Sequence, residues 1–292
     1  MQIFKLKLYF SRRITFQVVL LLFLSFPLSA QTSDTTTYQI LKTFPLQAAF
    51  ITMDALQQWY IATETGQLFK YDKRGQLLFE YSNDRLGRIG MIDATNPFNV
   101  LVYYPDLATV ILLDRTLSEI KEINLLALAI FEPQAIALAN DNNIWVYDPI
   151  AAQLKKIDRT GIVLFQSKNL TQAIGISIRP TFMIERNNQL FLSDPQQGIF
   201  IFDAFGQLQQ QLPILEVEQF QLLNLQLLYM DRDVIHRVPV NRISTTLPVI
   251  EKEVIRIAAT KIDPIKIERT YLLNNSLLVL TKDAVLLLQQ KK

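Results

Sequence analysis

Short apolar runs, each closed by turn-forming residues, recur along the chain, and residues 131–166 show the pattern most clearly. Four runs lie in this stretch: Gln134–Ala139, Ile144–Tyr147, Gln153–Ile157 and Gly161–Gln166. The turns between them contain Asn and Asp, which tolerate positive φ, and Gly161, which adopts left-handed conformations freely. Four short strands joined by hairpins predict an antiparallel meander of the size of one β-propeller blade.

The second run of this stretch is apolar on both faces. Trp145 and Tyr147 alternate with Ile144 and Val146. In a propeller both faces of a central strand pack against neighbouring blades, so neither pair is expected to be exposed.

The rest of the chain repeats this order of runs and turns. The further copies are Phe50–Ser82, Ile89–Leu125, Pro180–Leu212 and Glu218–Ile257, with a three-stranded copy at Ile267–Gln290. An aspartate marks the third turn of four copies, at Asp72, Asp114, Asp158 and Asp203. These aspartates are separated by 42, 44 and 45 residues, a repeat length typical of propellers.

The last copy lacks a fourth strand, and Tyr38–Phe44 supplies one from the start of the chain. We expect this segment to pair beside Ala284–Gln289, which closes the ring and removes free sheet edges. The predicted fold class is therefore all-β, a β-propeller of six four-stranded antiparallel blades. An open β-sandwich of similar strands is the alternative, but it requires no fixed repeat length. Helices are scarce, and only Leu125–Ala129 is expected to form a helical turn.

The start of the chain has the features of a signal peptide. Four basic residues precede an apolar run, Ile14–Phe26, and small residues lead to a cleavage position after Ala30. An uncleaved anchor is the alternative, but the run of 13 residues is short of the roughly 20 that span a bilayer. The expected organisation is a signal peptide over 1–30, a flexible lead-in over 31–37 and one propeller domain over 38–290. We expect an exported protein of the periplasm or cell surface, with no stable membrane anchor after leader removal.

Charge and cysteine content narrow the classes of function. The chain has 29 Lys and Arg and 27 Asp and Glu; four basic residues lie in the leader, so 25 basic and 27 acidic residues remain, a balance of −2. A nucleic-acid surface needs a basic cluster, and none is visible in that remainder, so no nucleic-acid partner is expected. The absence of cysteine excludes a disulfide framework and a lipidated cysteine. Burial of apolar side chains must therefore stabilise the fold.

Residues 133–165 resemble an NHL-type propeller repeat. The matching positions are Pro133, Ala135, Ile136, Ala137, Asn142, Ile144, Trp145, Val146, Asp148, Leu154, Ile157, Asp158 and Gly161. Over roughly 38–290 the chain is similar to six-bladed NHL/YVTN-like propellers of exported bacterial proteins, although it has only 8 glycines and lacks the usual glycine in each first hairpin. The resemblance implies a fold but little about activity, because such propellers include binding scaffolds, sensor domains, lyases and lactonases.

The turns between the second and third strands of each copy carry acidic residues that a propeller gathers on one face. They are Glu64, Asp106, Asp148, Asp194, Asp231 and Asp283. Tyr104 and Tyr147 flank two of these turns, and Arg88 and Arg179 lie on the crossings between blades. Carboxylates near arginines could bind a cationic ligand, Ca²⁺ or a partner protein. The competing interpretation is ordinary turn chemistry, which favours Asp at such positions.

The sequence offers little for catalysis. His236 is the only histidine and lies among Val234, Ile235 and Val238, so a structural role is expected. One histidine and no cysteine exclude a zinc site. A Ca²⁺-dependent lactonase needs Glu, Asp and Asn on its channel strands, but the inner strands here are mostly apolar. They carry Ile51, Met53, Met91, Ile136, Leu138, Met183, Leu222 and Leu272. No catalytic residue, metal or cofactor is therefore expected.

Two functions remain open. The first is a non-enzymatic exported propeller, a monomer or a subunit of a larger assembly, that acts as an interaction scaffold for an envelope or surface protein or a glycan. Its predicted contact residues are Tyr104, Asp106, Tyr147, Asp148, Asp194, Arg88 and Arg179. The second is a Ca²⁺-binding enzyme of the lactonase or lyase kind. The lack of clustered His, Glu or Asn on the inner strands favours the first.

Overall fold

The computed structural model describes residues 34–231, 234–240, 250–257, 267–273 and 276–291. The predicted signal peptide and residues 31–33 lie outside the described residues. In the part of the chain that is described, no helix is long and apolar enough to span a membrane.

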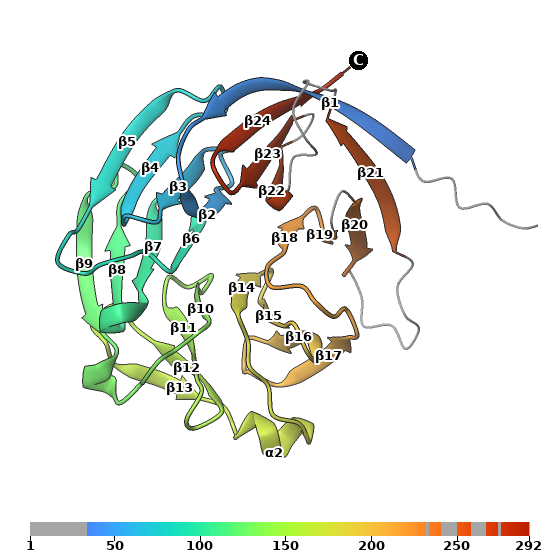
Figure 1. The fold of residues 1–292 in the computed structure, drawn as a ribbon. Helices are drawn as coiled ribbons and strands as arrows, with labels where there is room; N and C mark the ends of the chain where they lie inside the picture. Colours follow the sequence, from blue (N-terminus) through green and yellow to red (C-terminus); the bar gives the residue numbers. More distant parts are fainter. Residues whose placement is uncertain (1–33, 232–233, 241–249, 258–266, 274–275, 292) are drawn as a thin grey trace, which may run out of the picture. The chain divides into compact units, whose positions relative to one another are not determined.

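The described strands form six four-stranded antiparallel blades arranged in a ring, so the predicted fold class is confirmed (Figure 1). Blade 1 contains β2 (Ala48–Met53), β3 (Trp59–Thr63), β4 (Gln67–Tyr71) and β5 (Leu77–Ser82). Blade 2 contains β6 (Met91–Asn96), β7 (Asn99–Tyr104), β8 (Thr109–Leu113) and β9 (Glu119–Asn124). Blade 3 contains β10 (Ile136–Leu138), β11 (Ile144–Asp148), β12 (Gln153–Ile157) and β13 (Val163–Gln166).

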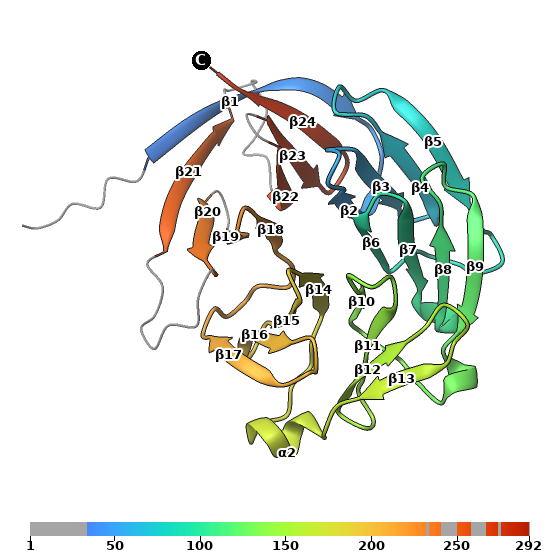
Figure 2. The ribbon, with the colours of Figure 1, turned by 180° about the vertical axis from the view of Figure 1, so that it is seen from behind.

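The remaining strands complete the ring. Blade 4 contains β14 (Phe182–Arg186), β15 (Gln189–Asp194), β16 (Gly198–Asp203) and β17 (Leu208–Leu212). Blade 5 contains β18 (Gln221–Leu223), β19 (Gln226–Asp231), β20 (Val234–Pro239) and β21 (Glu251–Ile257). Blade 6 contains β22 (Ile267–Leu273), β23 (Ser276–Thr281), β24 (Val285–Gln290) and β1 (Asp34–Phe44). Both views show the first strand of each blade on the inner side of the ring (Figures 1 and 2).

The strand β1 closes the ring as predicted, and it also joins blades 5 and 6. Its residues 38–44 pair antiparallel with β24, from Tyr38 opposite Gln290 to Phe44 opposite Val285. Its residues 34–38 pair in parallel with β21, which links the two blades into one eight-stranded sheet. The strand therefore begins at Asp34, inside the segment expected to be a flexible lead-in. The threonines of that segment favour extended structure, and the free edge of β21 supplies their backbone partners.

Apolar side chains from neighbouring blades form the core. On β11, Trp145 and Tyr147 pack in one cluster with blade 4 side chains such as Phe200, while Ile144 and Val146 belong to the cluster shared with blade 2. All four β11 side chains are buried, which confirms the expectation for this strand. Residues that alternate along one strand thus stabilise two different blade contacts.

A recurring aspartate turn connects the third and fourth strands of blades 1 to 4. In each turn one carboxylate oxygen accepts the backbone N–H groups two and four residues later, at 2.7–2.9 Å. The aspartates are Asp72, Asp114, Asp158 and Asp203. This bonding explains why the sequence repeats aspartate at these positions, because the carboxylate satisfies two backbone donors that the turn leaves free.

Helical structure is limited to short connections. The 3₁₀ turns are η1 (Pro105–Leu107) and η2 (Leu126–Leu128), the second of which lies where a helical turn was expected. The helix α2 (Leu170–Ile174) was not predicted, because it is a single turn. Its local signals are Asn169, whose side chain accepts the N–H of Gln172, and Gly175, which ends it at φ +85°.

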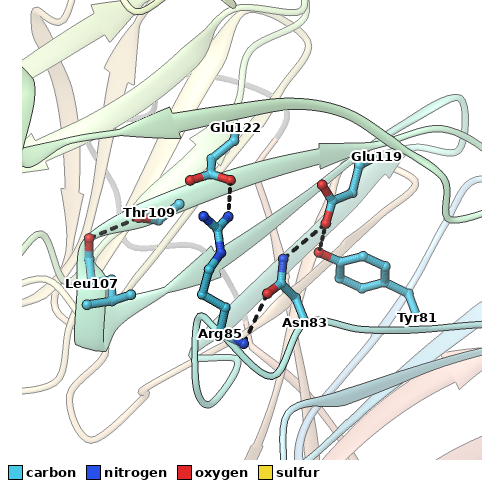
Figure 3. A network of polar contacts seen from close by, with 7 residues as sticks. All are labelled: Tyr81, Asn83, Arg85, Leu107, Thr109, Glu119 and Glu122. Atoms are coloured by element: carbon cyan, nitrogen blue, oxygen red, sulfur yellow. Dashed lines mark hydrogen bonds and ion pairs between the residues drawn. The ribbon is translucent and has the colours of Figure 1, made fainter.

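Polar contacts hold the outer edge of blade 1 against that of blade 2 (Figure 3). Tyr81 and Asn83 both donate to the Glu119 carboxylate, at 2.7 and 3.1 Å. Arg85 forms an ion pair with Glu122 at 2.5 Å. These contacts lie at the end of β5 and orient that strand relative to β9.

Candidate functional site

The predicted contact residues lie at one end of the blades, which we call the crossover face. Because strands alternate in direction, the turns between second and third strands and the crossings to the next blade meet at this end. The opposite end, which we call the hairpin face, carries the other turns of each blade. The seven predicted residues come from blades 2, 3 and 4 and from two crossings between blades, but their environments differ.

Tyr104 and Tyr147 are core residues and offer no contact area to a partner, so that expectation is wrong. Their exposed fractions are 0% and 2%. The hydroxyl of Tyr147 donates to the carbonyl of Ile178 at 3.1 Å, and burial raises the pKa of Tyr104 to about 12. Both lie at the end of a central strand, where the ring still fills the space between blades.

Asp148 and Asp194 are also buried, and their carboxylates are used within the fold. Asp148 pairs with Lys155 at 2.6 Å and accepts the N–H groups of Ile150 and Ala151. Asp194 accepts N–H groups of its own turn on one oxygen and the backbone N–H of Arg179 on the other, at 2.7 Å. Both carboxylates are therefore ordinary turn residues, which was the alternative to a role in binding.

Arg88, Asp106 and Arg179 are the predicted residues whose side chains remain exposed. Arg88 and Asp106 face each other at 3.5 Å, with side chains 68% and 51% exposed. A pair this open and this long is weak on its own, so either partner can exchange it for a better contact. Of the predicted polar site, only the weak ion pair of Arg88 with Asp106 and the separate side chain of Arg179 are therefore accessible to a partner.

Exposed apolar side chains on the crossover face of blades 2 and 3 were missed by the sequence analysis. They are Leu107, Leu126, Phe131 and Ile150, with exposed fractions of 45%, 46%, 45% and 75%. Leu107 belongs to η1 and Leu126 to η2, and the N–H of Leu125 bonds the carbonyl of Ala108 at 2.9 Å, which joins the two turns. The signal for this group was apolar residues within turns, where polar residues are usual.

The central channel contains a cavity of about 280 Å³ lined by inner strands of five blades. Its walls are largely apolar, as expected, but Asp93 and Arg186 also line it. Asp93 accepts the N–H groups of Thr95 and Leu138, both at 2.8 Å, so it bonds blade 2 to the innermost strand of blade 3. Burial raises the pKa of Asp93 and lowers that of Arg186. The carboxylate thus has a structural role that its place on an inner strand did not reveal.

His236 lies on β20 with its ring stacked on Tyr229, 4.6 Å between centroids and 5° between planes. Neither ring nitrogen has a hydrogen-bond partner among the described residues, and burial lowers the pKa of the ring. A general base requires an aligned acid and a nucleophile, and neither contacts the His236 ring within the described residues. Over the same described ranges, no three His, Asp or Glu side chains come together as a metal site.

Similarity to known proteins is confined to the fold. The sequence matches no protein-family profile and no curated protein. A streptogramin B lyase structure has a TM-score of 0.61 at 11% identity, covering 86% of this chain and 97% of that one. The Pan2 WD40 domain of Neurospora crassa has a TM-score of 0.57 at 10% identity, covering 84% and 89%. BBS1N in complex with ARL6DN has a TM-score of 0.52 at 11% identity, covering 84% and 78%.

These likenesses identify the chain as a six-bladed β-propeller. One of the three structures is a lyase and another is bound to a second protein, so the architecture supports both catalysis and binding. At such low identity the fold alone is shared, and function must be argued from the residues of this chain.

Proposed function

We propose that the chain is an exported, non-enzymatic propeller of the NHL/YVTN-like kind that binds a protein of the bacterial envelope or surface. The contact surface is the crossover face of blades 2 and 3. The observation that carries this proposal is the group of exposed apolar side chains there, Leu107, Leu126, Phe131 and Ile150. The basic leader followed by an apolar run supports export.

The chemistry of this surface favours a protein partner. Burying one large apolar side chain contributes about 1.5–3 kcal/mol, so a partner that covers several of them has a substantial driving force. Arg88 and Asp106 lie near the same turns and can form charge-assisted bonds at the rim of the contact. A glycan would need exposed aromatic rings to stack on, and Phe131 is the one aromatic side chain of the group.

The structure offers less support for catalysis than for binding. The only histidine of the chain is stacked on Tyr229 within blade 5, and Asp148 and Asp194 are already bonded within their turns. A partner protein needs only the exposed groups, which is the simpler use of this face.

The test is a comparison of two matched double variants. Phe131→Lys with Ile150→Lys places charge on the crossover face, and Leu56→Lys with Phe98→Lys does so on the hairpin face, where these side chains are 57% and 62% exposed. Proteins recovered from envelope extracts on the parent and on each variant are quantified by mass spectrometry, and direct affinities follow for any partner found. We expect the crossover variant to bind at least about a hundredfold more weakly, because it loses two apolar contacts, and the hairpin variant to bind like the parent.

Folding of both variants is checked by thermal unfolding, since all four positions are exposed and should tolerate lysine. Equal recovery of the partner by the crossover variant and the parent would place the contact elsewhere. Ca²⁺-dependent turnover of a lactone or ester by the parent would instead support the enzyme alternative.

A further inference from the structure

The outer strands of blades 1 to 4 are sheet edges, and β5 of blade 1 is unusually apolar. Leu77, Leu78 and Phe79 are consecutive on this strand and are 51%, 38% and 38% exposed. Figures 1 and 2 show β5 on the outer side of the ring. A free edge carries unpaired N–H and C=O groups, and proteins usually protect such edges with charged side chains.

The outer strands of blades 2 and 4 are more polar than β5. Strand β9 contains Glu119, Lys121 and Glu122, and β17 contains the three glutamines 209–211. Strands β9 and β17 each expose one apolar side chain among these polar ones, Ile120 and Leu208, whereas β13 of blade 3 has no charged residue and exposes Leu164 at 53%. The comparison between β5 and β13 is therefore the informative one.

The charges at the ends of these two strands differ in sign. Lys73 and Arg74 precede β5, whereas Glu80 and Asp84 lie at its other end, and all four are exposed. None of the four forms an ion pair within the described residues. Arg85 follows Asp84 but is paired with Glu122 of blade 2. Strand β13, by contrast, follows Asp158 and Arg159 and precedes Lys168, so its far end carries no acidic residue.

Antiparallel pairing of two identical strands brings the start of one against the end of the other. For β5 this juxtaposes two basic residues with two acidic residues, while for β13 it sets Lys168 against the mixed pair Asp158 and Arg159. The edge of β5 is also held in place, because Tyr81 and Asn83 anchor its end to Glu119 of blade 2 (Figure 3). The molecule already extends one blade into another at β1, where a single strand joins β21 to β24.

We infer that two copies of this chain associate through antiparallel pairing of their β5 strands. The dimer is two-fold symmetric, buries Leu77, Leu78 and Phe79 of each copy, and places the basic end of each strand beside the acidic end of its partner. Backbone hydrogen bonds between the two strands supply affinity. The charges at the strand ends favour antiparallel pairing of β5 with the β5 strand of a second copy.

The first experiment measures oligomeric state by sedimentation velocity over a range of concentrations. The parent is expected to dimerise, Leu78→Lys to remain monomeric, and the matched change Leu164→Lys on β13 to dimerise like the parent. Thermal unfolding of each variant shows that its blades are intact. A parent that stays monomeric at its highest soluble concentration overturns the proposal, and so does a Leu78→Lys variant that dimerises as the parent does.

The second experiment tests the charge pattern with two chains. One carries Lys73→Glu and Arg74→Glu, so both ends of its β5 are acidic; the other carries Glu80→Lys and Asp84→Lys, so both are basic. Each alone should dimerise at least about tenfold more weakly than the parent, because several exposed pairs become repulsive. An equimolar mixture should form the heterodimer, since opposite charges then meet at both ends. A mixture that associates no better than its components overturns the antiparallel arrangement.

Discussion

Blades 1 to 4 and blades 5 and 6 reach the same architecture by different routes. In the first four, consecutive strands complete each sheet, and an aspartate turn joins the third strand to the fourth. In the last two, β1 comes from the opposite end of the chain to join eight strands into one sheet. Local hairpins close short loops, whereas pairing Phe44 with Val285 brings together residues about 240 positions apart. Four blades are thus encoded locally, and closure is a long-range contact.

The long-range strand is also where side chains from three blades meet. Tyr38 of β1 packs with Leu228 of blade 5 and Leu277 of blade 6. Phe44 lies edge-on to Trp59 and Tyr71 of blade 1, with ring centroids 5.0 Å apart in each case. One strand therefore stabilises the part of the ring where the sequence repeat is weakest.

Removing β1 should have the largest effect on stability. A chain that begins at Ala48 loses the outer strand of blade 6 and leaves the edges of β21 and β24 unpaired, so we expect aggregation and loss of cooperative unfolding. Soluble yield and calorimetry report both effects. A synthetic peptide of residues 34–46, added during refolding, should restore part of the native signal. A shortened chain that melts like the longer one would show that closure does not depend on β1.

Truncating a buried side chain in one of the locally encoded blades should lower stability less than removing β1 does. Trp145→Ala is expected to lower the free energy of unfolding by about 3–5 kcal/mol, because it removes a fully buried ring. The indole N–H also donates to buried Glu185 at 2.6 Å, so Trp145→Phe should still cost about 1–3 kcal/mol. Denaturant midpoints and slopes measure both values. Unchanged midpoints would contradict the packing described for blade 3.

Replacing the aspartates of the turns between third and fourth strands should have the smallest effect on stability, and this effect is visible only at acid pH. Hydrogen bonds hold the pKa values of Asp114 and Asp158 below the ordinary value of 3.8, with Thr116 and Ile162 as the main donors. The unfolded chain then binds protons more tightly, so the stability from these groups is present above about pH 4 and is lost as the pH falls through the folded values.

The matched variant keeps the acceptor but removes the titration. Asp114→Asn with Asp158→Asn should show a flatter fall in stability below pH 4 than the parent, measured by denaturant unfolding at several pH values. Because buried Asp93 and Asp54 have raised pKa values, the difference between the two proteins is the informative quantity. Identical slopes would mean that the turns contribute nothing through ionisation.

The blades were predictable because their signals are local. Alternation of apolar residues and the Asn and Asp turns act over fewer than about ten residues, and the aspartate spacing shows that the same local unit recurs. The pairing of Tyr38–Phe44 with β24 was predictable because the last copy of the repeat has only three strands and needs a fourth. Pairing of residues 34–38 with β21 did not, because no count required a strand shared between two sheets.

The site was less predictable than the fold. Asp148 and Tyr147 have the residue types of a binding surface, yet Lys155 and the carbonyl of Ile178 occupy their polar atoms. Leu107 and Ile150 were missed because an apolar residue in a turn is buried or exposed according to what crosses above it. The segments beside these turns are the exits of the same blades, such as Leu125 at Ala108 and Leu170 at Ala152, and their course is fixed only by the packing of the ring.

By itself, the sequence determined the strand period, the turn positions and the number of blades, since backbone preferences act between residues close along the chain. Only the tertiary structure decided which side chains face solvent, because each face of a strand is covered by a blade some forty residues away. It also decided that β1 joins two blades, since that pairing depends on an edge left free at the other end of the chain.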